Sequence, residues 1–183
     1  MELIKQNSQT KIIKSIIFIF LGSVILAISA KIKIPFYPVP MTMQTFVVLL
    51  LGIGLGYKIA LAAVSLYLLE GILGLPVFSS SPERGVGLTY FTGPTMGYLI
   101  GFLTASYFSS YVRKEDNYLM IFIKLILAVS TIYLLGILWL GTVIGWEKPL
   151  IELGILPFLL AEIFKISLLT ILAKKILEFR KFI

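Results

Sequence analysis

Two oppositely charged residues, Glu162 and Lys165, lie three positions apart in an otherwise apolar stretch, "GILPFLLAEIFKISLLTILAKK" (residues 154–175). On a helix, residues three apart share one face, so the carboxylate and the ammonium can meet. An ionisable group at the centre of a membrane span costs about 2.5–3.5 kcal/mol on insertion scales, so two of them indicate a role. Either they form a structural ion pair, or they face a polar cavity and hold a zwitterion or a ligand with one acidic and one donor-rich end.

The composition excludes most other chemistry. The chain of 183 residues has no Cys and no His, which rules out disulfides, thiol catalysis, His bases and Cys or His metal ligands. It is 58% hydrophobic with a mean hydropathy of +1.01, and 14% of its residues are charged, against about a quarter in soluble domains. These values predict one integral membrane domain over residues 1–183. The net charge of +7 forms no basic patch interleaved with aromatic residues, so nucleic acid is not an expected partner.

Six apolar runs predict the transmembrane helices that position this pair, and the expected fold class is therefore all-α. The runs cover residues 12–30, 43–55, 59–75, 94–112, 119–140 and 151–173. The second run, about 13 residues at 1.5 Å per residue, is short for a full span. Gly52, Gly54 and Gly56 predict a tight turn between the second and third runs.

The distribution of Lys and Arg predicts that both termini lie in the cytoplasm, because inner loops carry the excess of basic residues. The predicted inner set is Lys5, Lys11, Lys14, Lys58, Arg113, Lys114, Lys124, Lys174, Lys175, Arg180 and Lys181, and the outer set is Lys31, Lys33, Arg84 and Lys148. Two outer loops stand out. Prolines stiffen "KIKIPFYPVPMT", and "GLPVFSSSPERGVGLTYFTGP" is long enough to act as a lid or binding loop.

Four segments occur in an order that resembles a known family. They are "IPFYPVPMTMQTFVVLLLG", "YLLEGILGLPVF", "GPTMGYLIGF" and "LPFLLAEIFK", and together they resemble the biotin-specific S components of energy-coupling factor transporters, the BioY family. The resemblance implies a six-helix protein of the cell membrane that captures biotin from outside, with no cofactor. It also implies partners, namely a transmembrane coupling subunit and a pair of ABC-type ATPases. The chain itself has no GxxxxGK[ST] phosphate loop.

The resemblance also implies site residues. In the last helix Lys165 matches the family pattern, whereas Glu162 stands where the family has Asp and Ala161 where it has Gly. Biotin has two N–H donors and an acceptor on its ureido ring and a carboxylate on its tail, so Glu162 and Lys165 suit its polar ends, in an order that the sequence leaves open. Arg84 is a further candidate for the carboxylate. The expected hydrogen-bonding partners are Gln44 and Thr42, and the expected apolar wall is Phe36, Phe78, Tyr90 and Tyr98.

A second surface is expected on the first helix. Ser23 and Ala27 form a small-xxx-small pair and Ala30 lies near the same side, a pattern that lets helices approach closely in lipid. By resemblance, these residues dock on the coupling subunit. They can equally pack against another helix of the same chain.

Three functions are therefore weighed. The first is a biotin-binding subunit of an ATP-driven importer, and the second is a solitary biotin facilitator or ion-coupled carrier. The third is a membrane-embedded enzyme, against which the lack of His, Cys and clustered acids argues.

Overall fold

A computed structural model describes residues 2–35 and 37–182, with the backbone alone for residues 2–8. The elements in chain order are α1 (Glu2–Lys31), β1 (Lys33–Ile34), β2 (Met41–Thr42), α2 (Gln44–Ile72), α3 (Gly87–Phe91), α4 (Met96–Ser109), α5 (Tyr118–Ile144), α6 (Leu150–Gly154), a 3-10 turn (Leu156–Phe158), α7 (Leu159–Ile176) and a second 3-10 turn (Leu177–Phe182). The all-α class is confirmed. The one addition is a short antiparallel pair, β1 with β2, in which Lys33 lies opposite Thr42.

Helix α2 is folded back on itself at Gly56, which has φ 73° and ψ 167°, a conformation that glycine adopts readily. The side-chain amide of Gln44 donates to the Tyr67 hydroxyl at 2.7 Å, although the two residues are 23 positions apart. In a straight helix they would be about 34 Å apart. The helix is therefore two limbs, residues 44–55 and 57–72, and the turn predicted at the glycines is confirmed.

The bend leaves carbonyl oxygens at the end of the first limb without helical partners. The Arg180 guanidinium, near the end of the chain, donates to Ile53 O at 2.8 Å and to Ser110 O at 2.7 Å. One cation thus joins the α2 bend, the end of α4 and the C-terminal turn.

Four helices of the described residues are long and apolar enough to cross a membrane: Gln9–Lys31, Gln44–Ile72, Tyr118–Ile144 and Leu150–Phe182. With α2 divided at its bend and α4 added, six helical segments correspond to the six predicted runs. The protein is a multi-pass membrane protein.

One predicted boundary is wrong. The expected continuous span 151–173 is broken into α6, a 3-10 turn and α7, which begins at Leu159. Pro157 lies in the break. It accounts for the break, because proline lacks a backbone N–H donor and disfavours the helical conformation in the residue before it. Glu162 and Lys165 are therefore near the start of α7 rather than at the centre of a long helix.

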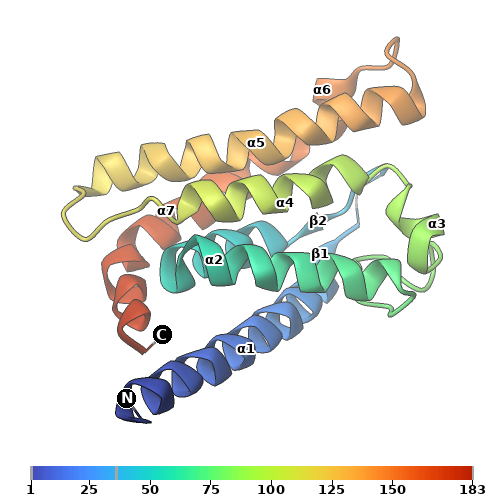
Figure 1. The fold of residues 1–183 in the computed structure, drawn as a ribbon. Coiled ribbons are helices and arrows are strands. Elements are labelled where there is room, and N and C mark those ends of the chain that lie inside the picture. Colours follow the sequence, from blue (N-terminus) through green and yellow to red (C-terminus); the bar gives the residue numbers. More distant parts are fainter. Residues whose placement is uncertain (1, 36, 183) are drawn as a thin grey trace.

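The two ends of the chain lie at one end of the bundle, which also holds the loop between α4 and α5 (Figure 1). The opposite end holds the β1–β2 pair, α3 and α6. Helices α4 and α5 pack closely, since a Cβ on Gly101 would lie 2.6 Å from Ile132 Cα. This close pair forms one wall of the candidate site.

Candidate ligand-binding site

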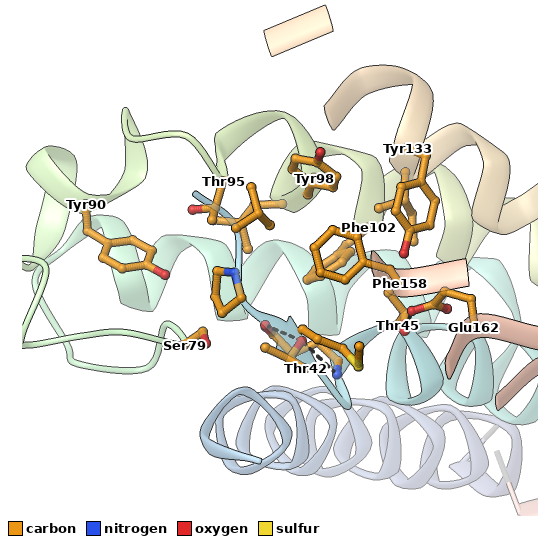
Figure 2. A pocket seen from close by; sticks show the side chains of 16 residues that line it. Thr42, Thr45, Ser79, Tyr90, Thr95, Tyr98, Phe102, Tyr133, Phe158 and Glu162 are labelled. Atoms are coloured by element: carbon orange, nitrogen blue, oxygen red, sulfur yellow. Dashed lines mark hydrogen bonds between the residues drawn. The ribbon is translucent and has the colours of Figure 1, made fainter. Parts of the chain in front are cut away.

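A cavity lies between the start of α2, α4, α5 and α7, near the end of the bundle that holds the β1–β2 pair, and Figure 2 shows the side chains that line it. Its lining is Val39, Pro40, Met41, Thr42, Gln44, Thr45, Ser79, Tyr90, Thr95, Tyr98, Leu99, Phe102, Ile132, Tyr133, Phe158 and Glu162. The wall is therefore mostly apolar and aromatic, with a few polar side chains that can orient a ligand.

Glu162 and Lys165 form a buried ion pair, with 2.8 Å between Lys165 Nζ and Glu162 Oε1. Both residues are at least 94% buried. The Thr45 hydroxyl contacts both charges: it donates to Glu162 Oε1 at 2.8 Å and accepts from Lys165 Nζ at 3.0 Å. The two charges share one helical face, as their spacing predicted, and they form the ion pair that was one of the two alternatives; a third residue, from α2, completes the network.

The Lys165 ammonium uses all of its donors inside the protein. Besides Thr45 and Glu162, it donates to the backbone oxygen of Thr42 at 2.7 Å, and an ammonium has three donors. A ligand contact to Lys165 therefore requires it to release one of these bonds. Whether Lys165 contacts the ligand stays a prediction.

Two buried polar atoms have no hydrogen-bond partner within the described residues, Glu162 Oε2 and Ser79 Oγ. Both residues line the cavity, and they lie toward its opposite ends (Figure 2). Buried polar atoms are nearly always paired, so two exceptions in one cavity indicate contacts that a ligand would complete.

The 78–81 segment, which carries Ser79, is held by two lysines, Lys31 at the end of α1 and Lys33 in β1. Lys31 Nζ donates to Phe78 O at 2.9 Å and to Ser81 O at 2.8 Å. Lys33 Nζ donates to Ser79 O at 2.9 Å. These bonds fix the backbone of the segment at the edge of the cavity.

Four other predicted residues line the cavity: Gln44, Thr42, Tyr98 and Tyr90. Thr42 Oγ1 donates to Gln44 Oε1 at 3.2 Å. The Tyr98 hydroxyl donates to Gly154 O at 3.0 Å, so this ring both lines the cavity and holds α6. Thr42 is the last residue of β2 and Gln44 the first of α2, which places both at the start of the first α2 limb.

Three predicted residues, Lys165, Phe78 and Arg84, are not among those that line the cavity. Phe78 is not among the lining residues and instead stacks behind Tyr90, with ring centroids 5.0 Å apart. Arg84 is also outside the lining and donates to Pro38 O at 2.9 Å, which ties the loop after α2 to the loop between β1 and β2. Phe36 lies outside the described residues.

The three expected docking residues are mostly turned inward. Ser23 and Ala30 are fully buried, and the Ser23 hydroxyl donates to Glu70 on α2. Ala27 is half-buried. In this structure the small residues serve the contact between α1 and α2, and only Ala27 reaches the surface.

Sequence reasoning missed Thr45, Ser79 and Tyr133 as lining residues. The Tyr133 hydroxyl points toward Glu162 (Figure 2). Thr45 and Tyr133 carried a usable signal, because polar side chains inside apolar spans usually face the protein interior. Ser79 gave no such signal, since its loop contains three consecutive serines.

The fold and the cavity define a multi-pass helical membrane protein with a small-molecule site near one end of its bundle. A family model described as "BioY family" matches residues 4–182. The chain belongs to the BioY family, as its sequence motifs predicted. Membership in this transporter family also excludes the membrane-embedded enzyme.

Individual relatives agree with this assignment. The chain is 33% identical over 163 residues to a probable biotin transporter BioY of Pyrococcus horikoshii, covering 89% of this chain and 96% of that protein. It is 35% identical over 161 residues to biotin transporter BioY2 of Lactococcus lactis, covering 86% of each. The crystal structure of the S-component for biotin from an ECF-type ABC transporter has the same fold, with a TM-score of 0.77 at 23% identity, covering 92% of this chain and 93% of that one.

Proposed function

We propose that this protein binds biotin from outside the cell and delivers it through an ATP-driven importer, as its membrane-embedded substrate-binding subunit. One observation carries the proposal: a mostly apolar cavity with an unpaired carboxylate oxygen toward one end and an unpaired hydroxyl toward the other. The names of the relatives, biotin transporters, agree with a ligand of this shape.

The ends of biotin match the two unpaired atoms. Its ureido ring offers N–H donors, and Glu162 Oε2 can accept one without disturbing the bonds that Oε1 already makes. Its tail carboxylate accepts from the Ser79 hydroxyl, and its apolar ring body lies among Phe102, Tyr98 and Phe158. This places the ureido ring deep, against α7, and the tail toward the outer loops.

The orientation in the membrane follows from the same site. The cavity lies at the end of the bundle that carries Lys31, Lys33 and Arg84, and we place this end outside. Both termini, at the opposite end, then lie in the cytoplasm with most of the remaining basic residues, in agreement with the positive-inside rule.

Energy for uptake comes from partners, a transmembrane coupling subunit and a pair of ABC-type ATPases, since the chain has no phosphate-binding loop of its own. Helix α1 is the candidate contact. Its exposed face is apolar and includes Phe20, Ile28 and the half-buried Ala27. A solitary carrier is the second candidate, without a specific observation in its favour.

Calorimetry with biotin on the purified protein tests the ligand. We expect Ser79→Ala to weaken binding of biotin more than binding of biotinamide, whose neutral tail makes a weaker hydrogen bond than a carboxylate does. The neighbouring Ser80→Ala is the matched control, because Ser80 is buried in the same segment but does not line the cavity. Equal losses for both ligands would contradict the placement of the tail.

Uptake into liposomes tests the energy source. The purified chain should bind biotin without concentrating it, with or without a proton gradient. Accumulation should begin when the coupling subunit, the two ATPases and internal ATP are added. Gradient-driven accumulation by the chain alone would overturn the subunit proposal and favour the solitary carrier.

A further inference from the structure

Thr45 occupies a distinctive place in the buried network. It lies in the first turn of α2, whereas Glu162 and Lys165 both lie on α7, 117 and 120 positions later in the chain. Among the described residues, it is the one other side chain that hydrogen-bonds to both Glu162 and Lys165. All three residues are at least 92% buried, so water does not compete strongly for these bonds.

The direction of the bonds is fixed by chemistry. An ammonium can only donate, so the Thr45 oxygen accepts from Lys165, and its single proton is then directed to Glu162 Oε1. Oε1 therefore receives two hydrogen bonds, from Thr45 and from Lys165, while Oε2 receives none within the described residues.

This asymmetry matters because the last torsion of a glutamate side chain is broad and roughly two-fold. A lysine alone would not hold the carboxylate in one orientation, since an ammonium on a flexible stem can bind either oxygen or both. A hydroxyl held on a separate helix selects one oxygen. It thereby leaves the other directed toward the cavity.

We infer that Thr45 is a positioning residue of the ligand site: its hydroxyl holds the Glu162 carboxylate so that Oε2 is presented to an N–H donor of the ligand. The inference rests on the proposed function and deepens it. Without the hydroxyl, Lys165 gains a free donor and can bridge both carboxylate oxygens. The acceptor that the ligand needs is then occupied from within the protein.

The test compares Thr45→Val, which keeps the shape and removes the hydroxyl, with Thr45→Ser, which keeps the hydroxyl. We expect Thr45→Val to weaken biotin binding about tenfold, the effect of one buried hydrogen bond, and Thr45→Ser to restore most of the loss. Thr104→Val is the control, because the Thr104 hydroxyl joins α4 to Thr131 on α5 at 2.8 Å and does not line the cavity. It should leave biotin affinity unchanged.

A double variant separates positioning from general structure. If Thr45 acts through Glu162, then Thr45→Val should add little to the loss already caused by Glu162→Gln. Full additivity of the two losses, wild-type affinity in Thr45→Val, or failure of Thr45→Ser to recover binding would each overturn the inference. Absence of biotin binding by the unaltered protein would instead overturn the proposed function, and the role of Thr45 with it.

Discussion

Replacing Glu162 with Gln tests the central contact of the proposed site. The new side chain has one acceptor oxygen and one NH₂ group in place of two acceptor oxygens. Lys165 and Thr45 both donate toward the position of Oε1, so they select the Gln oxygen. The NH₂ group then takes the position of Oε2 and faces the N–H of the ligand. Both groups are donors, so no hydrogen bond can form between them.

The expected size of the effect follows from the bond that is lost. A hydrogen bond to a charged group contributes about 1.5–3 kcal/mol, which corresponds to roughly a 10- to 150-fold loss of affinity. The protein also loses stability, because breaking a buried ion pair costs about 3–5 kcal/mol. We expect a loss of stability near the lower end of that range, since Lys165 keeps its hydrogen bonds to Thr42 O and Thr45.

The assay is calorimetric titration with biotin, together with a melting curve of each variant without ligand. Glu162→Asp keeps the charge on a shorter side chain and should bind with an affinity between those of the wild type and the Gln variant. Glu152→Gln, an exposed acid on α6, is the control and should change neither quantity. A folded Glu162→Gln protein that binds biotin with wild-type affinity would refute the reasoning and leave the pair a purely structural one.

Three further predictions concern α1 and the ends of the helices. Ala27→Leu should leave biotin binding unchanged and lower uptake in the assembled transporter, whereas the buried Ser23→Leu should lower both, because it forces α1 away from α2; uptake that is normal in Ala27→Leu would exclude this face as the contact. Gly52→Ala should lower the free energy of unfolding by about 1–3 kcal/mol, because the added methyl overlaps α4, and a melting curve that matches the wild type would contradict that packing. Arg180→Gln should lower the melting temperature more than Lys181→Gln does, because it leaves carbonyl oxygens at the α2 bend without a donor, at about 1–3 kcal/mol for each buried group; equal shifts in the two variants would argue against that role.

The sequence predicted the helices and the turn at Gly56 because apolar runs and glycine conformations are local properties. It also predicted that Glu162 and Lys165 share one helical face, since a spacing of three on a helix is local as well, but it left open whether they pair. The start of α7 was misplaced even though Pro157 was visible. The residues on both sides of Pro157 are apolar, so the hydropathy pattern predicted one continuous span across the proline.

Local patterns marked Thr45 as a polar residue in an apolar span, but they could not predict that it contacts Glu162 and Lys165. Thr45 is one polar residue in "MTMQTFVV", next to the more conspicuous Gln44. Which of these side chains faces α7 depends on where α2 begins and how it packs on a helix more than a hundred residues away. For the same reason, the sequence left open whether Ser23 faces a partner or packs inside the chain, and its hydrogen bond to Glu70 shows that it packs inside.

In the part of the chain that the structure describes, several basic side chains donate hydrogen bonds to backbone carbonyl oxygens and not to carboxylates. Lys31, Lys33, Arg84 and Arg180 all donate to carbonyl oxygens, as expected in a chain with 16 basic and 9 acidic residues. A carbonyl acceptor persists whatever side chain its residue carries. Substitutions at the accepting positions can therefore accumulate during evolution while the cation stays fixed, and these links would leave no trace of paired changes between homologous sequences.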